Sequence, residues 1–416
     1  MGTFKDLYPE YKEKYPHTCV GFTTFFREKP LGLVYAGQNG THNVCVCQYH
    51  ENCRLLLFSL ENIVDIRDII QENEPWDYKT ILKYFTCDKS EEDCWLYDDC
   101  EDCKMRITAL EDNLFCSIEA EDITFSQWQS TDRTQIINQT STKEEFIKLF
   151  IESFQYLKYH NYVKETQVKY FYKLKESLED GEALAVGDFS ENFQFIIQDA
   201  IQGVHWSNDM ATLHPFVVYF KDQSGNIDQK SIVFISDDTS HNQVQVWTFQ
   251  KYLIRFLKDL VPGFRRIFYY SDGCSAQYKN KKSFLNLLHH KKDFGIEAGG
   301  WFFWATSHGK GPWDGLAGQI KYQATKESLI RPPNNPLITA YDLYEFAKNK
   351  FKTIQIDYVS EEEILNDGIF LQTRFAKVKK LKGTRTFHSY EPVSLKEIKT
   401  KVVSLSENYQ NFVISS

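Results

Sequence analysis

The order of strand and helix signals over residues 182–350 constrains the fold more than any other feature of the chain. Three strand-like segments come first, and helical segments separate the later strands. Strands are predicted at 183–195, 212–222, 230–237, 265–272 and 299–306, and helices at 244–261, at 281–292 and from Pro312 toward Leu329. The resulting order, β-β-β-α-β-α-β-α, predicts an α/β domain with a mixed sheet, because the later strands need helical crossovers to run parallel.

Three aspartates fall where this layout would bring them together. Asp188 lies in the first predicted strand, Asp272 ends the fourth, and Asp314 stands at the start of the last helix. The first and fourth strands are expected to be neighbours, with the last helix packed beside them. Ligands of open α/β sheets bind at the carboxyl ends of the strands. The three carboxylates, spaced by 84 and then 42 residues, should therefore converge.

Converging carboxylates suit the cleavage of a phosphodiester bond. That reaction needs an activated water or hydroxyl and stabilisation of the leaving oxygen, which two divalent ions about 3.5–4 Å apart can supply. We expect Asp188 to bridge two Mg²⁺ or Mn²⁺ ions, Asp272 to bind one of them and Asp314 the other. Taken singly, Asp188 could cap a turn, and Asp314 could be an acid in the first turn of a helix, where the helix dipole favours a negative charge. Glu327 is the alternative third acid.

Polar residues near Asp272 and Asp314 are candidates for contact with DNA. The net charge of −9 does not point to nucleic acid, but residues 255–282 and 374–385 are locally basic, and local patches decide whether phosphate can bind. Glycines beside both acids permit a close approach of backbone to phosphate. The candidate DNA contacts are Gln277, Lys279, Asn280, His308 and Lys310.

Nine of the ten cysteines precede residue 117. In an intracellular protein such crowding favours metal binding over disulfides, with buried free thiols as the alternative. Cys100 and Cys103 form a C-x2-C pair, whose tight turn aims both thiolates at one ion. One or two structural Zn²⁺ ions are expected, and the pairing of their ligands stays open. The candidate zinc ligands are Cys45, Cys47, His50, Cys53, Cys87, Cys94, Cys100 and Cys103.

The chain divides by composition into four predicted regions. These are an N-terminal Cys/His-rich, zinc-binding module (1–125), a helical connector (126–180), the α/β core (181–350) and a C-terminal extension (351–416). No apolar run approaches the roughly 18 residues that cross a bilayer, and the first residues lack the apolar segment of a signal peptide. We therefore expect a soluble, intracellular protein with no membrane partner.

Several runs resemble a group of animal proteins derived from DNA transposons of the DDE/D superfamily. They are GDFSENF, SDGCSAQYKNKKSF and SHGKGPWDGLAG in the core and GTHNVCVCQYHENCRLL in the cysteine-rich region. The resemblance extends over roughly residues 15–330. It implies a ribonuclease-H-like core, the arrangement that the predicted element order also matches, with the catalytic acids at Asp188, Asp272 and Asp314.

The resulting expectation is a transposase-like polynucleotidyl transferase that cleaves and joins DNA by a two-metal mechanism in the nucleus. A homodimer on transposon ends is the candidate assembly. The alternative is a domesticated, catalytically inactive transposon-derived factor that binds DNA or protein. A ribonuclease-H-like exonuclease ranks last, because it expects a D-x-E pair on the first strand. Here Glu191 lies three residues after Asp188, which is out of register in a strand.

Overall fold

The computed structural model describes residues 8, 11–18, 20–27, 46–65, 69–70, 74–88, 91–196, 209–332 and 334–415. The chain forms two compact units, Met1–Cys47 and Gln48–Ser416. In the first unit, Tyr8 packs edge-on against Phe22 of α2 (Phe22–Arg27), with ring centroids 5.4 Å apart. The Tyr8 hydroxyl donates to the carbonyl oxygen of Val20 at 2.8 Å.

The second unit begins with short helices packed around a leucine- and phenylalanine-rich core. Its elements are α3 (Gln48–Glu61), α4 (Tyr78–Lys83), α5 (Glu92–Leu96), α6 (Glu101–Ser117), β1 (Asp122–Ser130) and β2 (Thr134–Thr142). The two strands form an antiparallel hairpin. The first part of the predicted helical connector, residues 126–142, is therefore β structure, because its alternating side chains follow the period of a strand.

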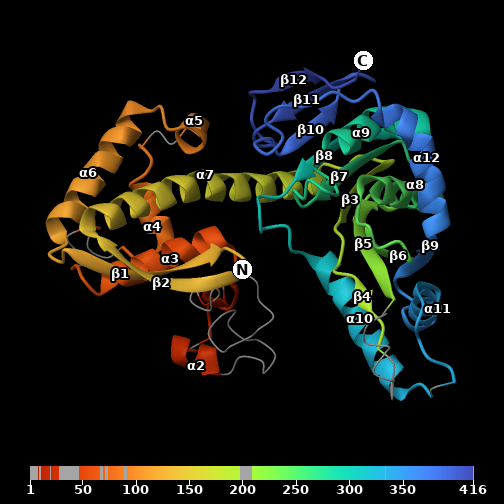
Figure 1. Cartoon of the computed structure of the whole chain (residues 1–416), viewed down its shortest axis with the longest axis horizontal. Coiled ribbons are helices and arrows are strands. Elements are labelled where there is room, and N and C mark those ends of the chain that lie inside the picture. Colours follow the sequence, from red (N-terminus) through yellow and green to blue (C-terminus); the bar gives the residue numbers. More distant parts are fainter. Residues whose placement is uncertain are drawn as a thin grey trace. The chain divides into compact units, whose positions relative to one another are not determined.

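The long helix α7 (Lys143–Glu176) joins this core to a large sheet (Figure 1). It begins with a capping box between Thr142 and Glu145, which satisfies free amides at the helix start. At 1.5 Å per residue its 34 residues span about 50 Å. Phe150 lies in the leucine- and phenylalanine-rich core, whereas Phe171 packs against the sheet. The helical spacing over 140–178 thus corresponds to one helix.

Among the described residues the sheet has ten strands, and five neighbouring strands at its centre correspond to those predicted from the sequence. The strands are β3 (Glu182–Gly187), β4 (Phe193–Gln194), β5 (Met210–Lys221), β6 (Ile227–Ser236), β7 (Arg266–Ser271), β8 (Glu297–Phe303), β9 (Gln355–Val359), β10 (Ser389–Pro392), β11 (Glu397–Lys401) and β12 (Gln410–Val413). Their order is β12-β11-β10-β8-β7-β3-β5-β6-β9, with β4 paired to β5. The strands β3, β5 and β6 form an antiparallel meander, and β7 and β8 continue the sheet parallel to β3.

Two features of this sheet differ from the expectation. The first predicted strand, 183–195, stops at Gly187, and β4 is a separate short strand. Residues 351–416 contribute four strands, since β9 pairs with β6 and β10 pairs with β8. The C-terminal residues therefore extend both edges of the sheet, which buries backbone groups that an edge strand would expose.

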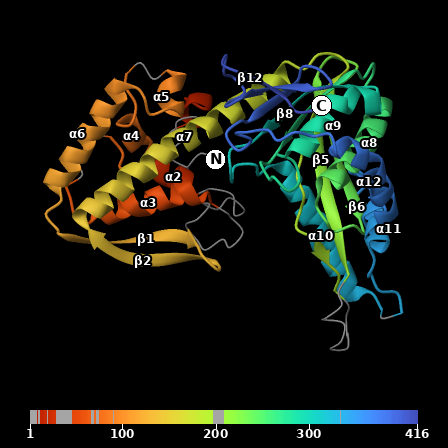
Figure 2. The same ribbon diagram turned by 45° about the horizontal axis from the view of Figure 1, so that its top comes forward.

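Helices cover both faces of the central strands. These helices are α8 (Gln243–Leu260), α9 (Lys281–Phe294), α10 (Pro312–Ile330), α11 (Ala340–Lys350) and α12 (Glu361–Phe375). Ala183 and Ala185 of β3 face the core beneath α8 and α9, whereas Leu184 and Val186 face α7. Figure 2 shows α8, α9 and α12 gathered on one side. Burial on both faces explains the continuous apolar run of β3.

No helix in the described ranges is long and apolar enough to cross a membrane.

A buried ion pair fixes α12 to α9. The guanidinium of Arg374 donates two hydrogen bonds of 2.6 Å to Asp293, and these side chains are 11% and 4% exposed. Replacing Arg374 by alanine should lower the free energy of unfolding by about 3–5 kcal/mol, because Asp293 stays buried without its counter-charge. Urea denaturation measures this loss. Lys104→Ala, which removes an exposed pair with Glu101, should cost under about 1 kcal/mol, and equal losses would contradict the prediction.

Candidate functional site

Asp188 and Asp272 directly follow adjacent parallel strands, β3 and β7. The ladder between these strands keeps a constant register and ends with Val186 opposite Tyr270, so each aspartate stands two residues beyond that pair. Neighbouring strands lie about 4.8 Å apart. The backbone therefore places the two aspartates side by side at the carboxyl edge of the sheet. Asp188 follows its strand instead of lying within it.

The two carboxyl groups influence each other electrostatically. Burial, followed by the charge of Asp272, raises the pKa of Asp188 to about 8, and a hydrogen bond from Tyr278 opposes that rise. Burial also raises the pKa of Asp272, although its carboxylate accepts a hydrogen bond from the Cys274 amide at 3.0 Å. Two ionised carboxylates in this position repel each other, so a cation between them would be favoured.

Asp314 lies at the start of α10 and is exposed. Its carboxylate accepts a hydrogen bond from the Gly311 amide at 2.8 Å, as expected for an acid in the first turn of a helix. The loop before Asp314 lies close to Asp272, because a Cβ atom on Gly309 would lie 3.3 Å from the Cβ of Asp272. The charge of Asp314 raises the pKa of both other aspartates. The oxygens of these three residues do not form a group that lies wholly within 4.8 Å.

Trp313 holds the loop that leads to Asp314. Its indole stacks on Trp304, with centroids 6.2 Å apart, and its Nε1 donates to the carbonyl oxygen of Gly309 at 3.1 Å. The side chain is 4% exposed and belongs to the apolar cluster that includes Phe171. Trp313 therefore packs into the interior, while the next residue, Asp314, is exposed.

The side chains around Asp272 form internal hydrogen bonds. Tyr278 is buried, and its hydroxyl lies 2.8 Å from Nε2 of His214. Lys279 is also buried, and its ammonium donates to the carbonyl oxygen of Arg385 at 3.2 Å. Burial lowers the pKa of Lys279 to about 7, and the charge of Asp272 opposes that shift.

The predicted DNA contacts occupy different environments. Asn280 caps α9 by accepting hydrogen bonds from the amides of residues 282 and 283, and Lys279 is enclosed as described above. Gln277 is half-buried and Lys310 is exposed. His308 is half-buried, and its ring contacts the rings of two other histidines. Among these five residues, Lys310 is thus the one whose charge is open to a ligand.

Four of the predicted zinc ligands come together. The Sγ atoms of Cys87, Cys94, Cys100 and Cys103 all lie within 4.8 Å of one another. The distance from Cys87 to Cys94 is 3.6 Å and that from Cys87 to Cys100 is 4.0 Å. A tetrahedral ion with Zn–S bonds of about 2.3 Å spaces its sulfur ligands about 3.8 Å apart. This four-cysteine group could therefore hold a metal such as zinc.

Burial has a chemical consequence for the four-cysteine group. It raises the pKa of Cys94 to about 12, and neighbouring thiols add to the rise. The pKa of Cys103 is raised as well, again mainly by burial. Without a cation these thiols stay protonated at neutral pH, whereas a bound divalent metal stabilises the thiolate form.

The other predicted zinc ligands divide differently. His50 lies in a second group of possible metal ligands with His160 and His308, two histidines that the zinc prediction did not include. Cys47 is a buried residue at the end of the first unit. Cys53 lies in the leucine- and phenylalanine-rich core, with its Sγ 3.6 Å from the carbonyl oxygen of Ser153. Cys45 lies outside the described residues. No spacing signal could have found the two added histidines, because they come from distant segments of the chain.

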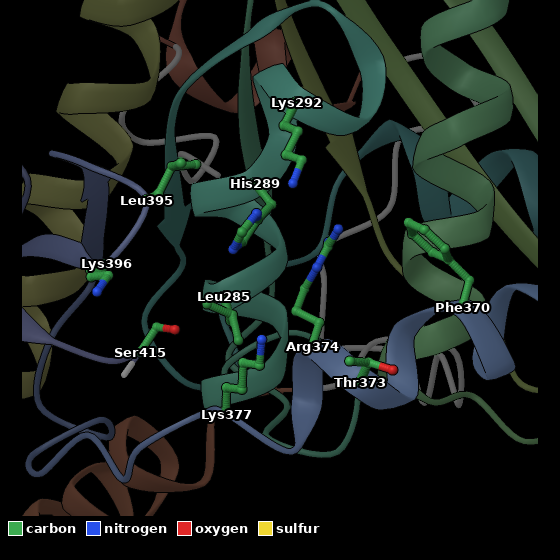
Figure 3. A pocket seen from close by; sticks show the side chains of 10 residues that line it. All are labelled: Leu285, His289, Lys292, Phe370, Thr373, Arg374, Lys377, Leu395, Lys396 and Ser415. Atoms are coloured by element: carbon green, nitrogen blue, oxygen red, sulfur yellow. The ribbon is translucent and has the colours of Figure 1, made fainter.

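A basic pocket lies away from these groups, between α9, α12 and the C-terminal strands (Figure 3). Its volume is about 370 Å³. His289 and Arg374 point toward its middle, and Lys292, Lys377 and Lys396 surround it. Because Asp293 already neutralises the charge of Arg374, the three lysines supply the positive charge that an anion would meet.

The fold and these groups define a mixed α/β protein with a Cys/His cluster that could hold a metal ion. The chain belongs to the family described as Domain of unknown function (DUF8701), whose model matches residues 167–404. A second model, Domain of unknown function (DUF8700), matches residues 48–158. No curated protein and no solved structure matches the chain.

Proposed function

We propose that the protein is a DDE/D-type transposase-like polynucleotidyl transferase with a ribonuclease-H-like core. The observation that carries the proposal is the placement of Asp188 and Asp272 at the in-register ends of adjacent parallel strands. The strand order supports it, since a three-stranded antiparallel meander continues into two parallel strands beyond its first member. A nuclear location and action on DNA follow from this proposal.

The three aspartates would hold two Mg²⁺ or Mn²⁺ ions. Carboxylate oxygens are the ligands that such ions prefer, and the mutual repulsion at Asp188 and Asp272 is the electrostatic setting in which a divalent cation is favoured. Ligands of two separate ions need not all lie within one coordination sphere, so the exposed Asp314 can belong to the second ion. Bound ions would activate the attacking water or hydroxyl and stabilise the leaving oxygen.

Other residues of the chain would position these acids. Tyr278 donates a hydrogen bond to Asp188, and Nε2 of His214 lies within hydrogen-bond distance of the same tyrosine hydroxyl. The Cys274 amide orients the carboxylate of Asp272. Trp313 anchors the loop that leads to the third acid. Tyr278, His214 and Trp313 are buried, and packed supports of this kind hold a site within the small tolerance that catalysis needs.

The test is a cleavage assay on DNA that carries the inverted repeats flanking genomic copies of this coding sequence. With Mg²⁺ or Mn²⁺, the full chain should nick these ends and join the new 3′-hydroxyl to a second duplex. Chelation by EDTA should stop both steps. Binding of the ends without any cleavage in either metal would overturn the catalytic proposal and favour an inactive, domesticated DNA-binding factor. Size-exclusion chromatography with and without the DNA ends tests the proposed homodimer.

A further inference from the structure

Three histidines from distant parts of the second unit form a compact triangle. His50 lies on α3, His160 on α7, and His308 in the loop between β8 and α10. Their ring centroids are 5.4 Å apart for His50 and His160, and 5.1 Å apart for each of the other two pairs. A tetrahedral ion with Zn–N bonds of about 2.0–2.1 Å separates the centroids of its imidazole ligands by about 5 Å. The triangle therefore already has the size that one ion requires.

The spacing of the ring nitrogen atoms also fits one tetrahedral ion. Nε2 of His160 lies 3.1 Å from Nε2 of His308, close to the roughly 3.3 Å between two nitrogen ligands of one tetrahedral ion. Nδ1 of His50 is buried and has no hydrogen-bond partner among the described residues. Its Nε2 lies 3.3 Å from Oδ1 of Asn161. That arrangement, in which one ring nitrogen bonds to an acceptor and the other is left over, is typical of a metal-binding histidine.

The chemistry of three imidazoles suits one metal ion. One ring nitrogen of each of the three histidines lies within 4.8 Å of one ring nitrogen of each of the other two. Imidazole is a borderline-soft ligand that suits Zn²⁺, and three protein ligands leave the fourth position of a tetrahedral ion to water.

We propose that His50, His160 and His308 bind one Zn²⁺ ion, separate from the four-cysteine group, and that this ion fixes the loop carrying His308. In that loop Ser307 adopts a left-handed backbone conformation with φ of 64°, which places His308 after the turn. The adjacent Gly309 lies against Asp272. The ion thus ties α3 and α7 to the loop beside the acids. The proposal concerns metal binding alone and holds whether or not the protein cleaves DNA.

The first experiment counts zinc in the purified full chain by elemental analysis. We expect two ions per wild-type chain and one in each of His160→Ala and His308→Ala. His289→Ala, which changes a half-buried histidine outside both groups, should keep two. One zinc in the wild-type chain, or two in both histidine variants, would overturn the proposal. If His160→Ala does not fold, the wild-type count and the loop variant His308→Ala still decide.

Two further measurements examine the ligands and the loop. In Cys103→Ser, which disables the four-cysteine group, bound Co²⁺ should lack the strong sulfur charge-transfer absorption that several thiolates would give. Strong absorption from several thiolates would contradict the assigned ligand set. Trypsin should cut after the exposed Lys310 at least about tenfold faster in His308→Ala than in the wild type, as expected when a loop loses its anchor. Equal rates would exclude the role of the ion in fixing the loop.

Discussion

Replacing Asp272 by asparagine is expected to reduce metal-dependent cleavage and joining of DNA ends by more than about 100-fold. The change keeps the shape of the side chain but removes the negative charge that a divalent ion needs. Loss of a residue that merely supports a ligand typically costs 10–100-fold in metal affinity or activity, so loss of a direct ligand should cost more. The amide oxygen can still accept the hydrogen bond from Cys274, so the local fold should persist. Single-turnover cleavage rates in Mg²⁺ measure the effect.

Glu191→Gln is the matched control, because this exposed acid also follows β3 and the change removes the same charge. It should leave the rate within about twofold of the wild type. Binding of DNA should be nearly unchanged in both variants, since lysine and arginine contacts with phosphate dominate affinity. Cleavage that survives in Asp272→Asn would show that a different acid binds the metal.

Replacing Cys103 by serine is expected to remove one zinc ion per chain and to destabilise the segment between Cys87 and the start of α6. Serine is a poor zinc ligand, and the binding energy of a structural zinc is largely folding energy, so the loss should amount to several kcal/mol. Elemental analysis gives the zinc content. Hydrogen exchange over residues 91–104 should show the loss of protection.

Cys116→Ser serves as the control for this prediction. Cys116 lies on the same helix, α6, but is exposed and belongs to neither group of possible metal ligands. Its replacement should alter neither the zinc content nor the exchange rates. Zinc retained in Cys103→Ser at the wild-type level, with exchange unchanged, would mean that the four buried thiols form a core without metal.

Local patterns in the sequence predicted the central elements well. The apolar strand at 183–187, the helix that stops before Pro262 and the strand before Asp272 each have a period and a boundary that can be found within a dozen residues. The C-x2-C pair likewise indicated two of the four clustered cysteines. Such features depend on neighbours along the chain, which explains why they can be recognised without a structure.

Long-range arrangements could not be predicted in the same way. The pairing of β9 with β6 and of β10 with β8 depends on which edge of the sheet is free, and no local pattern encodes that choice. The contact of His160 with His308 joins residues 148 positions apart. The parallel pairing of β3 with β7 was the exception, because the predicted element order already made the first and fourth strands neighbours.

The continuity of α7 has a consequence for how this chain can be divided. The match to the first of the two family regions, residues 48–158, ends within this helix, and the match to the second, residues 167–404, begins within it. Near its C-terminal end Gln167 donates to the carbonyl oxygen of Phe303 at 2.9 Å and accepts from the Ser404 amide at 2.8 Å. One inserted residue would turn everything beyond it by about 100°. The rotation of one matched region about the helix axis therefore depends on the number of helical residues that separate it from the other. A chimera that exchanges one of them must preserve the number of residues between His160 and Gln167.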